Sequence, residues 1–237
     1  AAIHCCSIKE SDEIQPLNIG TKIFILPNPV DDTLVGLEEK PGILQALCPG
    51  LRPHDKMLLY VGRITAIKQL QVLLKAFCSL HNKFKDVHLV LAGPLEDKEL
   101  VKSLQSCIKD NQLGDKVHMP GMVQGPEKAA LLRRATVFVQ PSKHENFGLS
   151  VAEALLFGKI SIVNDGVALA NEIAHAEAGV KYSGGADELT AVLGKIIVDD
   201  DFRRKCEQNA KELANNFKPA FIVKKMKLFY ETCISEK

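Results

Sequence analysis

The 237-residue chain lacks a long hydrophobic run, an excess of charge of either sign and a high content of aromatic residues. No stretch of 18 or more apolar residues occurs, so we expect no helix that crosses a membrane. The first residues, AAIHCCSIKESDE, have neither a basic segment nor an extended apolar segment, so we expect no secretory signal. The 30 Lys and Arg residues balance 29 Asp and Glu residues, which argues against nucleic acid or an anionic membrane as the main partner.

The cysteines are odd in number and have no repeated C-x-x-C spacing. All seven lie in apolar or helical stretches: Cys5, Cys6, Cys48, Cys78, Cys107, Cys206 and Cys233. We therefore expect free, buried thiols in a reducing compartment, and a cytoplasmic location. The composition, with 46% hydrophobic, 25% charged and 5% aromatic residues, is that of a globular protein of one or two domains. At this length about 70% of the unfolded chain's surface can be buried, so neither disulfides nor a structural metal is needed.

Short apolar runs rich in Val, Ile and Leu alternate with longer segments of helical periodicity. The runs predict strands at Lys22–Leu26, Met57–Val61, Val87–Ala92, Val117–Met119, Val137–Gln140 and Ile160–Val163. Apolar residues repeat with a helical period over 70–80 and over 189–197. This alternation predicts an α/β fold with a Rossmann-like parallel sheet and helices on both faces. Such a sheet binds ligands beyond the carboxyl ends of its strands, so the residues that follow each strand are the candidates.

The segment from Gly62 to Lys68 follows one predicted strand and carries two cations, Arg63 and Lys68. Gly62 permits a tight exit from the strand, and two cations beside the start of a helix suit a pair of phosphates. The alternative is two solvated loop charges. Neither the dinucleotide fingerprint G-x-G-x-x-G nor the Walker phosphate loop occurs in the segment, which disfavours nicotinamide chemistry and ATP hydrolysis.

The segment PSKHENFGLSVAEAL follows another predicted strand and carries two carboxylates eight residues apart, Glu145 and Glu153. Phe147-Gly148-Leu149 opens a helix whose first N–H groups point back toward the loop that holds Glu145. Two carboxylates beside a helix N-terminus can hold two diols with a phosphate between them, which is the layout of a nucleotide sugar. Alternatively, each glutamate is a solvated charge on a helix.

At this point five segments together resemble a known family: VGRITAIK, VHLVLAGP, MPGMVQ, PSKHENFGLSVAEALLFG and NEIAHAEAGV. They resemble the retaining nucleotide-sugar glycosyltransferases of the GT-B fold, in family 4, the glycosyl transferases group 1. The resemblance covers nearly the whole chain and implies the C-terminal, nucleotide-sugar-binding half of such an enzyme. Two departures are Gln69, where the family usually has Gly, and Lys159, where Pro is common. Neither position touches the donor in the family pattern.

The resemblance implies a role for each candidate site residue. The residues implied in catalysis are Arg63 and Lys68, which would hold the donor diphosphate, and Glu145, which would hold the transferred sugar. The other residues implied in donor binding are Gly62, the base-contacting turn Met122, Val123 and Gln124, the sugar-binding backbone of Phe147, Gly148 and Leu149, and the ribose ligand Glu153.

The family pattern also implies a division of the chain. Residues 1–30 would be a remnant of the N-terminal acceptor domain with its linker, and residues 31–216 the Rossmann-like nucleotide-sugar-binding domain. Residues 217–237 would be a C-terminal helix that crosses back to the N-terminal domain. Since the chain has no initiator methionine and most of the acceptor domain is missing, we expect a fragment. The apolar stripe of this last helix, at Ile222, Met226, Phe229, Tyr230 and Cys233, is then expected to be exposed and to self-associate or be mobile. A membrane-surface anchor is the alternative for this helix.

No metal site is predicted. The triplet Asp199-Asp200-Asp201 resembles a D-x-D metal motif, but Asp201 is expected to be the N-cap of a helix starting at Phe202. Cations from the chain can stabilise the leaving diphosphate, so no metal or other cofactor is required. His4, His54, His81, His88, His118 and His175 show no ligand spacing, and His144 is expected to be a surface group.

The resemblance therefore predicts a hexosyltransferase that moves a sugar from a nucleotide-sugar donor to the hydroxyl of a glycan, lipid or other acceptor, with retained anomeric configuration. The isolated chain is expected to be inactive without an acceptor domain. The alternative is a nucleotide-sugar-binding module without turnover that needs a separate acceptor chain. An epimerase or phosphorylase of the same fold is less consistent with the spacing of the two glutamates.

Overall fold

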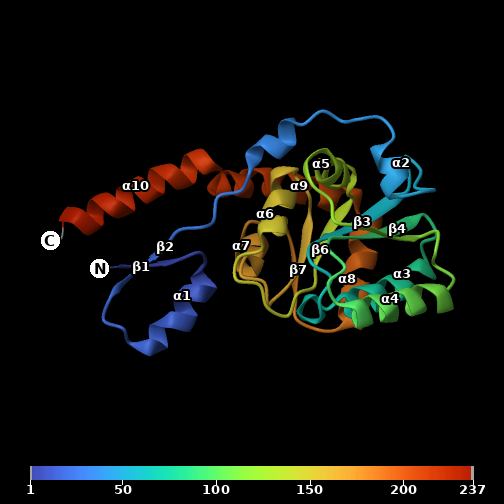
Figure 1. Ribbon diagram of the computed structural model, residues 1–237, viewed down its shortest axis with the longest axis horizontal. Coiled ribbons are helices and arrows are strands. Elements are labelled where there is room, and N and C mark those ends of the chain that lie inside the picture. The colour runs from blue at the N-terminus through green and yellow to red at the C-terminus, as the bar shows by residue number, and fades with distance from the viewer. Residues whose placement is uncertain (1, 236–237) are drawn as a thin grey trace.

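The computed structural model describes residues 2–235 and contains a six-stranded sheet in which every neighbouring pair is parallel (Figure 1). The strand order is β5-β4-β3-β6-β7-β8. The strands are β3 (Lys56–Val61), β4 (Val87–Ala92), β5 (Val117–Gly121), β6 (Val137–Gln140), β7 (Ser161–Asn164) and β8 (Gly179–Tyr182). The predicted Rossmann-like parallel sheet is confirmed.

Helices cover both faces of this sheet because its strands are apolar on both sides. In β3, Leu58 and Tyr60 face one core, whereas Met57 and Leu59 face the other. The first core is covered by α3 (Leu70–His81), α4 (Lys98–Asp110) and α8 (Ala186–Val198). The second is covered by α5 (Gly125–Arg134), α6 (Leu149–Leu156), α7 (Ala170–His175) and the C-terminal part of α9 (Asp200–Ala214). Two short turns of 3-10 helix, η3 (Ala66–Lys68) and η4 (Asn215–Phe217), precede α3 and follow α9.

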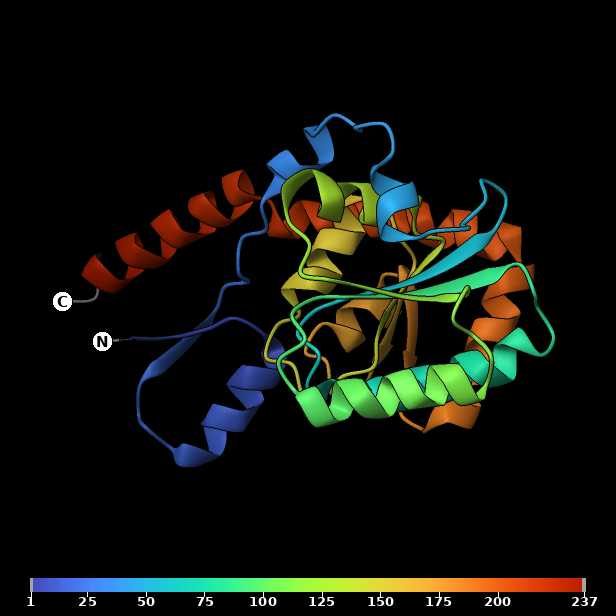
Figure 2. The ribbon, with the colours of Figure 1, turned by 45° about the vertical axis from the view of Figure 1, so that its right-hand side comes forward.

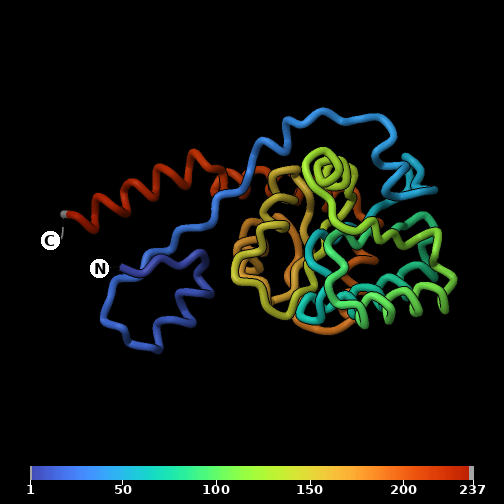
Figure 3. The backbone as a smooth tube through the Cα atoms, viewed as in Figure 1, coloured from blue at the N-terminus to red at the C-terminus, as the bar shows by residue number. Residues whose placement is uncertain are grey.

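A second, smaller unit precedes the six-stranded body. It comprises β1 (Ala2–Cys5), α1 (Ile8–Ile14), η1 (Gln15–Leu17) and β2 (Lys22–Ile25), and β1 pairs with β2 in parallel. We call these residues, 2–25, the N-terminal unit. A connecting stretch with η2 (Asp32–Gly36) and α2 (Ile43–Leu47) then leads into β3. Figures 2 and 3 show the N-terminal unit beside the body and on the same side as the C-terminal helix.

The last helix, α10 (Pro219–Ser235), reaches back toward the N-terminal unit (Figure 1). Its Phe229 ring lies 4.4 Å from the Phe24 ring of β2, between centroids. Just before α10, the Phe217 carbonyl accepts a hydrogen bond from the N–H of Val30 at 2.9 Å. The segment that follows β2 and the segment that leads into α10 therefore run side by side at this point. The division at residues 30/31 and 216/217 remains a prediction. None of the described helices is long and apolar enough to cross a bilayer.

Several sequence predictions were wrong in detail, including the ends of β2 and β5, which stop at Ile25 and Gly121. The stripe of α10 is not fully exposed, because Ile222 is buried and Phe229 packs on Phe24. The N-cap of α9 is Asp199, not Asp201, since its carboxylate accepts the N–H of Phe202 at 2.8 Å. Strand β7 runs one residue later than predicted, and β8 was missed because it is short and half-exposed.

Candidate functional site

Lys68 and Glu145 lie together beyond the carboxyl ends of the adjacent strands β3 and β6. They are 77 residues apart in the sequence, and the Lys68 ammonium forms an ion pair with the Glu145 carboxylate. Their side chains are 11% and 24% exposed, so the pair is shielded yet accessible to a ligand. The parallel pairing of β3 with β6 brings the two loops together. The structure thus joins two of the three residues predicted to act in catalysis.

The loop that carries Glu145 is held by backbone hydrogen bonds on both sides. Its Lys143 N–H donates to the Ile67 carbonyl, next to Lys68, at 3.0 Å. On the other side the Glu145 N–H donates to the Gly166 carbonyl at 3.1 Å, and its carbonyl accepts from Ala168 at 2.9 Å. Gly166 is required here, because a Cβ would lie 2.0 Å from the Lys143 carbonyl oxygen. The loops after β3, β6 and β7 therefore form one hydrogen-bonded assembly around Glu145.

Gln140, the last residue of β6, also contacts Glu145, and sequence reasoning missed it. The side chain is buried, and its Nε2 donates to Ser142 Oγ at 2.9 Å and to Glu145 Oε2 at 3.4 Å. Its Oε1 has no hydrogen-bond partner among the described residues. A buried polar residue at the end of an otherwise apolar strand was the signal that could have identified it.

Arg63 lies apart from the Lys68–Glu145 pair. Its side chain is 63% exposed and is 3.6 Å from the Glu96 carboxylate. Its carbonyl accepts a hydrogen bond from the Tyr60 hydroxyl at 2.9 Å, and burial raises the pKa of that hydroxyl, with a further contribution from Glu145. A Cβ at Gly62 would lie 2.6 Å from the same hydroxyl, so the strand exit needs glycine. Arg63 therefore pairs with Glu96 and is not paired with Glu145 as Lys68 is.

The N-terminus of α6 begins directly after the Glu145 loop. Gly148 is its N-cap, with φ of +94°, and no side chain caps the first turn. Phe147, just before this turn, is buried and packs edge-on against the Phe217 ring, with 5.6 Å between the ring centroids. Leu149 is exposed. An uncapped helix N-terminus beside a lysine is an arrangement that binds phosphate.

Glu153 lies on α6, and the residues around Met122 form the turn that leads into the neighbouring helix α5. The Glu153 carboxylate is paired with the Lys128 ammonium of α5 at 2.5 Å, and both side chains are largely buried. In the turn before α5, Val123 is buried, Met122 is exposed, and Gln124 Nε2 lies 3.8 Å from Met122 Sδ. The two predicted carboxylates thus each have a lysine partner, Lys68 for Glu145 and Lys128 for Glu153.

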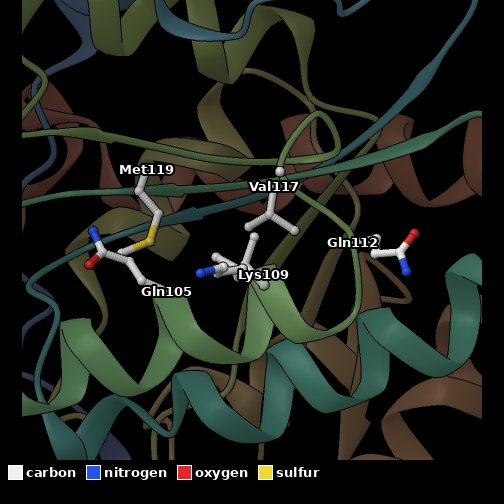
Figure 4. Close-up of a pocket in the computed structure, with 7 residues that line it drawn as sticks. Gln105, Lys109, Gln112, Val117 and Met119 are labelled. Carbon is white, nitrogen blue, oxygen red and sulfur yellow. The ribbon is translucent and has the colours of Figure 1, made fainter.

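Two other features of the described residues lie outside this arrangement. A pocket of about 490 Å³ lies between α4 and the edge strand β5, lined by Gln105, Ile108, Lys109, Gln112, Gly114, Val117 and Met119 (Figure 4). None of the predicted site residues lines it. Within residues 2–235, no three His, Cys, Asp or Glu side chains gather as metal ligands would.

Comparison with known proteins finds similarity between this chain and one family of enzymes. Residues 49–213 match the sequence model of the glycosyl transferases group 1. The chain is 28% identical to the alpha-monoglucosyldiacylglycerol synthase of Streptococcus pneumoniae over 194 residues, 82% of this chain and 42% of that protein. It is 34% identical to the D-inositol 3-phosphate glycosyltransferase of Pseudarthrobacter chlorophenolicus over 158 residues, 65% of this chain and 37% of that protein. The chain therefore spans less than half the length of these relatives.

Solved structures share the fold over nearly the whole chain. Sucrose-phosphate synthase from Thermosynechococcus elongatus superimposes with a TM-score of 0.84 at 21% identity, covering 100% of this chain and 59% of that one. Anabaena HepE, solved in complex with UDP-glucose, superimposes with a TM-score of 0.81 at 19% identity, covering 98% and 64%. At these identities the likeness is one of fold.

Proposed function

This chain belongs to the glycosyl transferases group 1, and from that premise we propose that it is the donor-binding part of a retaining GT-B enzyme of family 4. The enzyme would transfer a hexose from a nucleoside-diphosphate sugar to an acceptor hydroxyl on a glycan, lipid or other molecule. The single observation that carries the proposal is the assembly of Lys68, Glu145 and the open N-terminus of α6 at one point beyond the sheet. Cation, carboxylate and helix N–H groups are what a diphosphate attached to a sugar requires.

The diphosphate is assigned to Lys68, Arg63 and the first N–H groups of α6. Lys68 is already at the site, whereas Arg63 exchanges Glu96 for phosphate when the donor binds. When the bond between the anomeric carbon and the diphosphate breaks, negative charge grows on the leaving oxygen. These groups stabilise that charge without reorganising, which is the main source of catalysis on this half of the enzyme. The cations belong to the chain, and no metal is part of the proposal.

The sugar and the nucleoside are assigned to the two carboxylates and the turn before α5. Glu145 and the backbone of Phe147 to Leu149 bind the hydroxyls of the transferred sugar, and Glu153 binds the ribose diol. Met122 to Gln124 lie against the base. Because Lys68 contacts Oε2 of Glu145 and Lys128 contacts Oε1 of Glu153, the other oxygen of each carboxylate is available to accept from a hydroxyl. The free state of all seven cysteines suits the cytoplasmic location that we also propose.

Two matched variants test this assignment. Glu145→Gln is expected to weaken binding of a nucleoside-diphosphate sugar but not of the nucleoside diphosphate alone, whereas Glu153→Gln weakens both. Calorimetry with UDP, GDP and ADP and their glucose or mannose adducts provides the comparison, after thermal shift has selected the nucleotide. A ligand at 100 times its dissociation constant stabilises the protein by about 2.7 kcal/mol, a shift that is easily measured.

Equal losses of both ligands in both variants would contradict the assignment of the carboxylates. If no nucleotide shifts the unfolding temperature, the donor-binding function itself is wrong. Donor binding without transfer, when an intact acceptor domain and candidate acceptors are supplied, would instead support a binding module.

A further inference from the structure

The N-terminal unit contacts the loop that carries Glu145 and the adjoining loop after β7 through one hydrogen bond each. From α1, the Lys9 ammonium donates to the Gly166 carbonyl at 2.8 Å. From the end of β1, the Cys6 thiol lies 3.4 Å from the Asn146 carbonyl. These two carbonyls flank Glu145: one belongs to the next residue, and the other accepts the Glu145 N–H. The N-terminal unit, more than 100 residues away in the sequence, thus contacts the backbone on both sides of Glu145.

The Gly166 carbonyl is shared by two donors from different parts of the molecule, Lys9 and the Glu145 N–H. A carbonyl oxygen has two lone pairs, so both bonds can form together. The bond from Lys9 is charge-assisted, which makes it the stronger kind. Gly166 also lies close against the backbone of Lys143, because a Cβ on Gly166 would lie 2.0 Å from the Lys143 carbonyl oxygen. Lys9 therefore binds a carbonyl in a closely packed stretch of backbone.

The surroundings of Lys9 leave this contact without strong apolar support. A cavity of about 130 Å³ separates α1 from the loop between β7 and α7, lined by Ile8, Lys9, Asp12, Asp165, Val167, Ala168, Ala170, Asn171 and Glu172. The helix is therefore not packed tightly onto the loop at this point. Cys6 adds to the contact as a neutral thiol, because burial and the nearby Glu10 raise its pKa to about 12.

We propose that Lys9 is a positioning residue, which fixes the backbone at Glu145 through the Gly166 carbonyl and so couples the position of the N-terminal unit to the sugar-binding carboxylate. This inference rests on the proposed function for the role of Glu145, but the contact itself does not. Its consequence is that the donor sugar is held in its reactive orientation only when the N-terminal unit is docked. The nucleotide, which binds on the other side of the site, is insensitive to that docking.

The test uses the whole chain with Lys9→Met, Lys9→Arg and the control Lys40→Met, which removes an exposed lysine from the stretch between η2 and α2. Hydrogen exchange of residues 143–148 is expected to be faster in Lys9→Met and unchanged in the control. Binding of the nucleotide sugar is expected to weaken about tenfold in Lys9→Met, because the less constrained Glu145 must then be ordered when the sugar binds, while binding of the nucleoside diphosphate stays the same. Lys9→Arg is expected to restore most of the sugar-dependent affinity, which a change in overall stability would not reproduce.

The outcomes separate this inference from the function it rests on. Unchanged exchange of residues 143–148 in Lys9→Met would overturn the contact, whatever the ligand. Faster exchange with equal losses for nucleotide and nucleotide sugar would overturn the positioning role. If Glu145→Gln has no sugar-dependent effect while exchange still responds to Lys9, then the contact is supported and the assignment of Glu145 in the proposed function has failed.

Discussion

Each of the two site carboxylates is matched by a lysine from a neighbouring segment, Lys68 with Glu145 and Lys128 with Glu153. Both pairs are largely shielded from water, where an isolated carboxylate would repel an incoming diphosphate and would itself be costly to bury. The pairing neutralises each glutamate while each lysine contacts only one oxygen of its carboxylate. Exposed Arg63 differs, since its contact with Glu96 is in water and is worth little. We therefore assign Lys68 the fixed cation and Arg63 the mobile one.

A buried histidine pair lies near the amino ends of β4 and β5, whereas the candidate site lies beyond the carboxyl ends of β3 and β6. His88 Nδ1 is 3.0 Å from His118 Nε2, and His88 Nε2 is 3.2 Å from the Asp55 carboxylate and 3.2 Å from the Lys116 ammonium. Burial of the His118 ring and, as the next cause, the electrostatic effect of the neighbouring His88 together lower the pKa of His118 from 6.5 to about 4. Burial also lowers the pKa of His88.

This pair predicts an acid-sensitive stability. His118 binds its proton near pH 6.5 when unfolded but only near pH 4 when folded, so the unfolded state takes up more protons in between. The free energy of unfolding is therefore expected to fall by about 2–3 kcal/mol as the pH drops from 6.5 to 4. Urea titrations across this range provide the measurement. His118→Gln is expected to flatten the dependence, and His144→Gln, at an exposed loop position, to leave it unchanged; a steep fall that survives His118→Gln would contradict the assignment.

At the level of elements, the start of α6 depends on one glycine. Gly148 has φ of +94°, which is strained for any residue with a Cβ, and a Cβ would lie 3.4 Å from Val151 Cγ2 and from Val167 Cγ1. Gly148→Ala is expected to lower the free energy of unfolding by about 1–2 kcal/mol and to weaken nucleoside-diphosphate binding, because the first turn of α6 must tilt.

Gly114→Ala is the matched control, since a Cβ there meets no atom within 4 Å and its φ is ordinary. Chemical denaturation and calorimetry of the two variants measure both effects. A Gly148→Ala protein with the stability and the affinity of the control would show that α6 does not need the left-handed residue.

The elements that sequence could predict are those with strong periodicity. The apolar runs of β3, β4 and β6 and the helical stripe of α3 specify both type and position, because burial on two faces leaves few other solutions. Sequence could not give β8, of whose four residues only Tyr182 is buried, or the contact of Gln140 with Glu145, which depends on how β6 ends. Lys128 was missed for a similar reason. Its partner Glu153 is on another helix, and helix packing is a tertiary property.

At the level of the whole molecule, α10 and β2 support each other through one aromatic contact. Phe229→Ala removes the ring that packs on Phe24, and is expected to speed hydrogen exchange in residues 22–25 and 222–233. The free energy of unfolding is expected to fall by about 1–2 kcal/mol, less than for a fully buried aromatic side chain, because Phe229 is half-buried.

Leu228→Ala is the control for this prediction, because Leu228 lies on the exposed side of α10. Exchange in the six-stranded body is expected to stay the same in both variants. Equal exchange in residues 22–25 for Phe229→Ala and the original chain would mean that α10 contributes nothing to the N-terminal unit.

The hydrogen bond between Val30 and Phe217 has a mechanical consequence. The chain passes between the N-terminal unit and the body along the segment before η2, and the segment that enters α10 leaves the body beside it. The two connections are therefore fixed to each other where they leave the body, and neither can shift there without breaking this hydrogen bond. We expect a substitution that disrupts this junction to loosen the N-terminal unit, and with it the contacts of Lys9 and Cys6 with the carbonyls of Gly166 and Asn146.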